Sequence, residues 1–163
     1  MPKALDISVV VPAFNEEESM TELNEWISRV MTKHGFSYEI LLVDDGSTDA
    51  TWKKIKELSL INPNLKGLRF NRNHGKSAAL NSGFLHASGT VVITMDADLQ
   101  DNPEEIPELY RMIIDENYDL ISGWKKKRHD PIGKTIPSRF FKSWFRDYVS
   151  SYFFLFKKIF HVD

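Results

Sequence analysis

The stretch TVVITMDADLQDNPEEIP, residues 90–107, contains a strand, an acidic loop and a helix start in direct succession. Its apolar run, rich in β-branched residues, predicts a buried strand over residues 90–96. Asn102 can cap the next helix, expected over residues 102–117, and Pro103 suits its first position. A buried strand that leads into a capped helix is typical of an α/β fold.

The rest of the chain repeats this alternation. Further strands are expected over residues 6–14, 38–46, 65–70 and 118–123, and further helices over residues 15–35, 47–62 and 75–89. Strands that alternate with helices through short loops predict a mostly parallel sheet with helices on both faces. Ligands of such sheets bind outside the carboxyl ends of the strands, so we expect the functional site there.

The composition narrows the classes of protein to consider. A chain of 163 residues, 42% of them hydrophobic, suits one domain, and its net charge of −2 gives no sign of nucleic-acid binding. The absence of cysteine excludes a disulfide framework, a thiolate metal site and a cysteine nucleophile. The N-terminal apolar run is too short for a signal peptide or a membrane span, so we expect a cytoplasmic protein.

Closely spaced carboxylates follow the strand of residues 90–96. Asp96 and Asp98 are two residues apart, so in an extended chain both side chains would point the same way. Neighbouring carboxylates repel each other, and a hard divalent cation such as Mg²⁺ or Mn²⁺ would relieve the repulsion. Gln100 continues the alternation and offers a third oxygen. The alternative interpretation is a solvated acidic loop in front of a helix.

Asp44 and Asp45 end the strand expected over residues 38–46. A carboxylate at this place can accept hydrogen bonds from a ribose hydroxyl or a base N–H. Alternatively, Asp45 and Gly46 form a simple turn, and Asp44 or Ser47 is a helix cap. Thr48 could also cap the first turn of the helix that follows.

A Gly-Lys-Ser sequence at residues 75–77 suggests a phosphate-binding loop, but the upstream glycine of that motif is missing. The small residues Ala78, Ala79 and Ser82 instead favour a helix that packs closely on the sheet.

Four stretches in this order carry a family resemblance: VVVPAFNEEESM, EILLVDDGSTDAT, NRNHGKSAALNSGFLHASG and ITMDADLQDNPEEIPEL. Together they resemble a family 2 glycosyltransferase with the GT-A fold. Within that family they are most similar to the dolichyl-phosphate mannose synthase group and the bacterial polyprenyl-phosphate glycosyltransferases. The resemblance extends from about residue 7 to about residue 124 and is specific for the family, but not for the sugar.

The resemblance implies functions for individual residues. Those implied to bind the nucleotide sugar are Pro12, Phe14, Glu16, Asp44, Asp45, Lys76 and Asp96. The implied ligands of Mg²⁺ or Mn²⁺ are Asp96, Asp98 and Gln100. The implied catalytic residues are Asp96, Asp98 and Arg139, and Arg139 would contact the acceptor phosphate.

The implied reaction transfers a hexose, with inversion, from a donor such as UDP-glucose or GDP-mannose to a polyprenyl or dolichyl phosphate. The acceptor phosphate is already ionised at neutral pH, so the reaction needs positioning and charge neutralisation rather than a strong base. One alternative is a transferase acting on a cell-surface glycan. The other is a truncated nucleotide-sugar-binding scaffold without turnover, because chains of this family usually extend further.

Basic and aromatic residues gather in the last quarter of the chain. We expect residues 1–135 to form the catalytic domain, and residues 136–160, within a C-terminal segment 136–163, to form a long amphipathic helix or a helix pair. Cationic and aromatic residues on one helix are typical of a peripheral contact with a membrane, here its cytoplasmic face. The alternative is an ordinary core helix or a contact between copies in a homo-oligomer.

Overall fold

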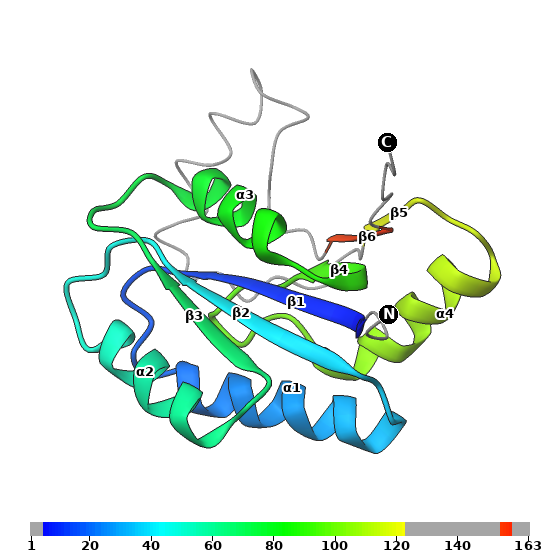
Figure 1. Ribbon diagram of the computed structural model, residues 1–163, viewed down its shortest axis with the longest axis horizontal. Coiled ribbons are helices and arrows are strands. Elements are labelled where there is room, and N and C mark those ends of the chain that lie inside the picture. Colours follow the sequence, from blue (N-terminus) through cyan, green and yellow to red (C-terminus); the bar gives the residue numbers. More distant parts are fainter. Residues whose placement is uncertain (1–4, 123–153, 158–163) are drawn as a thin grey trace, which may run out of the picture.

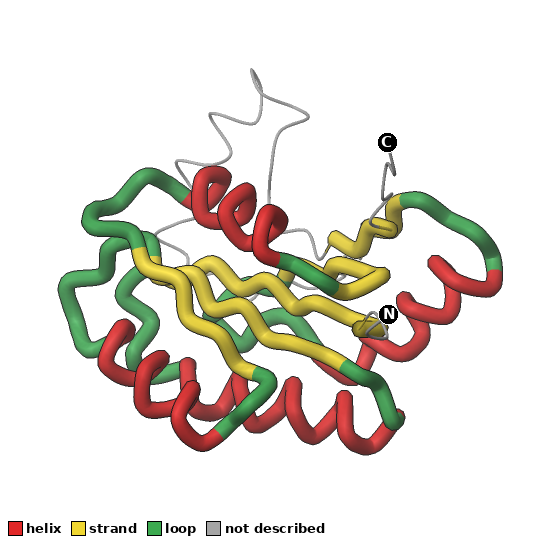
Figure 2. Tube along the Cα trace, in the orientation of Figure 1, coloured by secondary structure: helices red, strands yellow, loops and turns green. Residues whose placement is uncertain are grey.

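The computed structural model describes residues 5–122 and 154–157. Its elements, in chain order, are β1 (Leu5–Ala13), α1 (Met20–His34), β2 (Tyr38–Asp44), α2 (Thr51–Ile61), β3 (Leu65–Arg69), α3 (Lys76–His86), β4 (Gly89–Thr94), the short 3₁₀ helix η1 (Pro103–Glu105), α4 (Ile106–Asp115), β5 (Leu120–Ser122) and β6 (Phe154–Lys157). The strands form a single sheet in the order β3-β2-β1-β4-β6-β5. Helices cover both faces of this sheet, with α3 on one face and α1 and α2 on the other (Figures 1 and 2).

Four neighbouring strands of the sheet run parallel. β1 pairs in parallel with both β2 and β4, and β2 pairs in parallel with β3. Val9 lies opposite Ile40 on one side and opposite Ile93 on the other, so the centre of β1 is enclosed by apolar strands. The predicted α/β architecture with a mostly parallel sheet is therefore confirmed.

The strand that is last in chain order, β6, comes from the C-terminal part of the chain. β6 lies antiparallel between β4 and β5, with Val92 opposite Phe156 and Leu120 opposite the same residue on the other side. The helix predicted over residues 136–160 is thus wrong at Phe154–Lys157, where backbone pairing with two strands overrides the helical spacing of the aromatic residues. The remainder of that prediction lies outside the described residues.

Alternate side chains of β1 enter two separate cores. Ile7, Val9 and Val11 pack with apolar residues of α1, α2 and α4 on one face of the sheet. Val10 packs on the other face, against Ala79 of α3 and its neighbours. Burial on both faces explains why the strand reads as a continuous apolar run rather than an alternating one.

Close contact between α3 and the sheet depends on small residues, as predicted. Ala79 of α3 is fully buried on the side of the helix that packs against the sheet. The residue in closest contact, however, is Gly83, where an added Cβ would lie 2.2 Å from Cγ1 of Val10. This glycine allows α3 to approach β1 closely and so sets the height of the helix above the sheet.

Hydrogen bonds explain where the predicted element boundaries hold and where they do not. Asn102 does cap its helix, accepting a hydrogen bond from the Glu104 amide at 3.1 Å, although the first turn is 3₁₀. Neither Ser47 nor Thr48 caps α2, which begins only at Thr51. The amide of Thr51 donates instead to Oδ1 of Asp49 at 2.9 Å.

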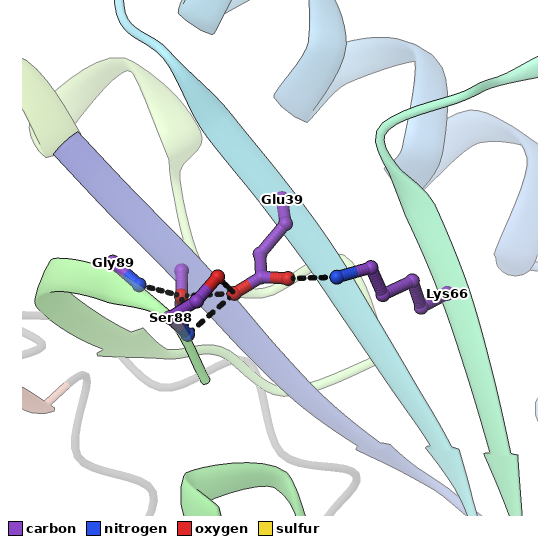
Figure 3. A network of polar contacts seen from close by, with 5 residues as sticks. Glu39, Lys66, Ser88 and Gly89 are labelled. Carbon is purple, nitrogen blue, oxygen red and sulfur yellow. Dashed lines mark hydrogen bonds and ion pairs between the residues drawn. The ribbon is translucent and has the colours of Figure 1, made fainter. Parts of the chain in front are cut away.

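A buried carboxylate joins the amino-terminal halves of the strands (Figure 3). Oε1 of Glu39 in β2 accepts hydrogen bonds from the Ser8 hydroxyl and from the amide and hydroxyl of Ser88, each at 2.7 Å. Its Oε2 accepts a hydrogen bond from Nζ of Lys66 in β3 at 2.8 Å. The Ser8 hydroxyl in turn accepts one from the amide of Gly89, the first residue of β4. One carboxylate thereby connects four strands at the end of the sheet opposite their carboxyl termini.

Candidate functional site

A cavity of about 340 Å³ opens at the carboxyl ends of β1, β2 and β4, beside the start of α3. Its lining residues are Pro12, Ala13, Phe14, Glu16, Asp45, Asn73, Gly75, Lys76, Asp96, Ala97 and Asp98. Most of the residues implied by the sequence to bind a nucleotide sugar or a metal are in this set. They come from four separate segments of the chain, which the parallel sheet brings to one edge.

Three of the residues singled out from the sequence do not line the cavity. Asp44 is fully buried, accepts a hydrogen bond from the Ser47 amide at 2.9 Å, and has Nε of Arg69 at 3.2 Å. Gln100 is exposed, and its amide donates to Oδ1 of Asp98 at 3.1 Å. Arg139 lies outside the described residues.

The loops that follow β1 and β2 are joined by hydrogen bonds. The amide of Asn15 donates to Oγ of Ser47 at 2.9 Å, and the amide of Glu16 donates to Oγ1 of Thr51 at 2.8 Å. Oδ1 of Asn15 accepts a hydrogen bond from the amide of Thr48 at 2.9 Å. Ser47 and Thr48, which the sequence suggested as helix caps, are therefore bonded to Asn15 instead, and Thr51 holds Glu16 at the cavity.

Asp45 holds the backbone of residues 74–75, next to the start of α3, in place at the cavity. The side chain is buried, and its two oxygens accept hydrogen bonds from the amides of His74 and Gly75, at 2.7 and 2.9 Å. The next residue, Gly46, has a φ of 74°, and a Cβ there would lie 2.3 Å from the backbone carbonyl carbon of Arg72. Asp45 and Gly46 together fix the segment that leads into α3.

The sequence analysis missed Asn73 and Gly75, which both line the cavity. They follow β3, and they could have been found by applying the strand-end rule to that strand as well as to its neighbours. Gly75 has a φ of 93°, a left-handed conformation that favours glycine at the residue before α3.

Asp96 and Asp98 lie in a turn rather than on an extended strand, because β4 ends at Thr94. The amide of Asp96 donates to Oδ2 of the buried Asp101 at 2.6 Å, which closes the turn. The premise that an extended chain aligns the two carboxylates is therefore wrong. Asp96 and Asp98 nevertheless both line the cavity, because the turn brings them there.

The cavity carries an excess of negative charge on one side. Burial raises the pKa of Glu16 above its usual range, and the nearby charges of Asp98, Asp49 and Asp96 raise it further, while a hydrogen bond from Ser19 opposes the shift. A second hollow of about 540 Å³ shares Glu16 and Asp98 with the first cavity and is also lined by Glu17, Glu18, Glu22 and Asp49. A cation bound near Asp98 would lower this repulsion.

The residues present fit a divalent cation that a ligand helps to hold. Within residues 5–122 and 154–157, no group of three or more His, Cys, Asp or Glu side chains could hold a metal ion by itself. Asp96 and Asp98 would supply carboxylate oxygens, which Mg²⁺ and Mn²⁺ prefer. Mg²⁺ is commonly bound by one or two carboxylates together with water and substrate phosphates, so two protein ligands suffice.

Several solved structures share the fold of this chain. The mannosyltransferase PcManGT from Pyrobaculum calidifontis, solved with GDP-Man and Mn²⁺, superposes with a TM-score of 0.71 at 22% identity, over 96% of this chain and 46% of that one. Glucosyl-3-phosphoglycerate synthase from Mycobacterium tuberculosis, solved with UDP, gives 0.66 at 21% identity, over 94% and 57%. S. aureus TarS 1-349, solved with UDP-GlcNAc, gives 0.58 at 26% identity, over 78% and 37%.

This chain thus spans about half the length of these proteins or less. The similarity confirms the predicted GT-A fold. The model of the family described as "Glycosyl transferase family 2" matches residues 8–162, nearly the whole sequence. The chain belongs to glycosyl transferase family 2.

Proposed function

We propose that this chain forms the donor-binding part of a metal-dependent, inverting hexosyltransferase that uses a nucleotide sugar. The observation that carries the proposal is the cavity itself, where Glu16, Lys76 and the Asp96–Asp98 segment meet although they lie far apart in sequence. An open cavity with four carboxylates, a cation and an aromatic side chain has the groups needed for a metal, a diphosphate and a base.

Each wall of the cavity has a proposed task. Phe14 is 43% exposed at the cavity, so its ring is available for stacking on a nucleobase. Lys76 offers an ammonium group to the diphosphate. Asp96 and Asp98 would hold Mg²⁺ or Mn²⁺, which when bound acts as a Lewis acid on the departing diphosphate. Asp45 contributes by positioning, since its carboxylate already holds the backbone of His74 and Gly75.

The proposed acceptor is a polyprenyl or dolichyl phosphate at the cytoplasmic face of a membrane. An ionised phosphate can attack without a general base, so the protein has mainly to position it and offset its charge. Arg139 and the basic residues around it, which lie outside the described residues, are proposed for that task. The peripheral membrane contact and the homo-oligomer through residues 136–163 also stay predictions. None of the helices in the described part of the chain is long and apolar enough to span a bilayer.

A neutral glycan is the second candidate acceptor, and the acidic hollow favours it. This is the second hollow described above, which adjoins the donor cavity and is lined by the carboxylates of Glu17, Glu18, Glu22 and Asp49. The negative charge of this hollow repels an anionic phosphate, whereas its carboxylates readily accept hydrogen bonds from sugar hydroxyls.

A thermal-shift experiment tests the proposed donor site. We expect UDP or GDP to raise the melting temperature by roughly 5 °C or more at saturating concentration, provided that Mn²⁺ or Mg²⁺ is present. Asp98→Ala should abolish the contribution of the metal, because the variant removes one of the two proposed ligands. Asp119→Ala, which removes an exposed aspartate outside the cavity, should behave as the wild type.

Equal stabilisation of Asp98→Ala and wild-type protein by metal plus nucleotide would contradict the proposal. UDP-glucose, GDP-mannose and UDP-GlcNAc can then be compared in the same assay to identify the donor. Transfer of labelled sugar to polyprenyl phosphate, measured beside transfer to a glycan, distinguishes the two acceptors.

A further inference from the structure

Lys76 and Asp96 form an ion pair across the cavity. Lys76 is the first residue of α3, and Asp96 lies in the turn after β4. Nζ of Lys76 is 2.5 Å from Oδ1 of Asp96, and the two side chains are 45% and 19% exposed. Among the described residues that line the cavity, no other two form an ion pair. A partly shielded pair of this kind is screened less by salt than a fully exposed one.

The carboxylate in this pair is one of the two proposed metal ligands. An ammonium group in contact with Asp96 repels a divalent cation that approaches the same carboxylate. Asp98, by contrast, forms no ion pair within the described ranges, so its charge is available to a metal. Among the described residues, therefore, Asp96 has a cationic partner and Asp98 has none.

We propose that Lys76 is an internal counter-ion that occupies the metal site until the donor nucleotide arrives. This inference rests on the proposed function and adds that the nucleotide has to bind before the metal binds tightly. The diphosphate of the nucleotide offers Lys76 a second anionic partner inside the same cavity. A lysine can change partners because its ammonium group is carried by a flexible four-carbon stem. Release of Asp96 by Lys76 then leaves both carboxylates to the metal.

Because Lys76 exchanges Asp96 for the diphosphate, binding of the nucleotide and binding of the metal are coupled. The nucleotide removes the competitor of the metal, so each ligand tightens the binding of the other by the same factor. The pair also limits the repulsion between Asp96 and Glu16 when no metal is bound. A site built in this way binds little metal until the donor is present.

Manganese binding without turnover tests this coupling. Free Mn²⁺ is measured by its electron paramagnetic resonance signal during titration of the protein, first alone and then with saturating UDP or GDP. For the wild type we expect the nucleotide to tighten Mn²⁺ binding by about tenfold, within the usual range of coupling between sites. For Lys76→Met we expect Mn²⁺ alone to bind about threefold to tenfold tighter than in the wild type, with a correspondingly smaller effect of the nucleotide.

Three further variants make the experiment specific. Lys56→Met removes an exposed lysine of α2 that does not line the cavity, so it controls for net charge and should match the wild type. Lys76→Arg keeps the cation and should keep the coupling, and Lys76→Gln provides a second neutral variant. Unchanged Mn²⁺ affinity in both neutral variants, with wild-type coupling, would overturn the counter-ion and leave the proposed function standing. Absence of Mn²⁺ binding in wild type and variants, even with nucleotide, would overturn both.

Discussion

At the scale of single residues, the buried charge of Glu39 links the electrostatics of the protein to its stability. Burial alone would raise its pKa, but hydrogen bonds from Lys66, Ser8 and Ser88 outweigh burial and lower the pKa to about 2. Because the usual value is 4.5, the folded state favours the ionised carboxylate. The resulting stabilisation is complete above pH 4.5 and is lost as the pH falls towards 2.

Glu39→Gln should therefore destabilise the protein in a pH-dependent way. At pH 7 we expect a loss of about 2–4 kcal/mol in the free energy of unfolding, because an amide cannot accept all the hydrogen bonds that the carboxylate accepts. Near pH 2 the difference from the wild type should largely disappear. Urea unfolding at the two pH values measures both quantities.

The matched control for this residue is Lys66→Met, which removes only the partner that is 60% exposed. We expect a loss of about 1 kcal/mol or less, since the serine hydrogen bonds to Glu39 stay in place. Wild-type stability of Glu39→Gln at pH 7 would show that the network contributes nothing to folding.

At the scale of elements, the contact of α3 with β1 determines where Lys76 lies. If the backbone did not move, Gly83→Ala would place a methyl group 2.2 Å from Cγ1 of Val10. The helix or the valine side chain therefore has to move. Alanine gains about 1 kcal/mol of helix propensity over glycine. Overpacking costs about 1–3 kcal/mol. We expect a lower melting temperature and weaker binding of nucleotide with Mn²⁺.

Asn81→Ala is the control for helix propensity, because Asn81 is exposed on the same helix. It should stabilise α3 slightly without touching the sheet. If Gly83→Ala raised the melting temperature as much as Asn81→Ala, the close approach of α3 to β1 would be wrong.

The ends of the helices show which element boundaries a local sequence pattern can predict and which it cannot. The cap at Asn102 was predictable because the side chain binds the amide of Glu104, only two residues ahead. The start of α2 was not, because Ser47 and Thr48 are engaged by Asn15, more than thirty residues earlier in the chain. Helix propensity and capping rules contain no information about such distant partners.

At the scale of the whole molecule, β6 closes the sheet from a distant part of the chain. It supplies the backbone partners of both β4 and β5. A chain that ends after Ser122 would leave the edge of β4 unpaired, and unpaired edges promote association between molecules. We expect this shortened chain to melt at a lower temperature and to self-associate in size-exclusion chromatography with light scattering.

A chain that ends after Lys157 keeps β6 and is the control for this truncation. It should elute as the full chain does and melt within a few degrees of it. A monodisperse, equally stable chain of residues 1–122 would show that β6 is dispensable. The family match, which extends to residue 162, agrees with a unit that includes the strand.

The sequence by itself determined the α/β alternation and the edge of the sheet that carries the site. Apolar runs and helix caps are local signals, and parallel strands necessarily end at one edge. Only the tertiary structure decided what each polar group there does. Asp45 binds amides that lie 29 and 30 residues away, and Asp96 binds a lysine 20 residues away. The strand at Phe154–Lys157 also exists only through its neighbours in the sheet. Partners so distant in sequence are chosen by packing, which no local pattern encodes.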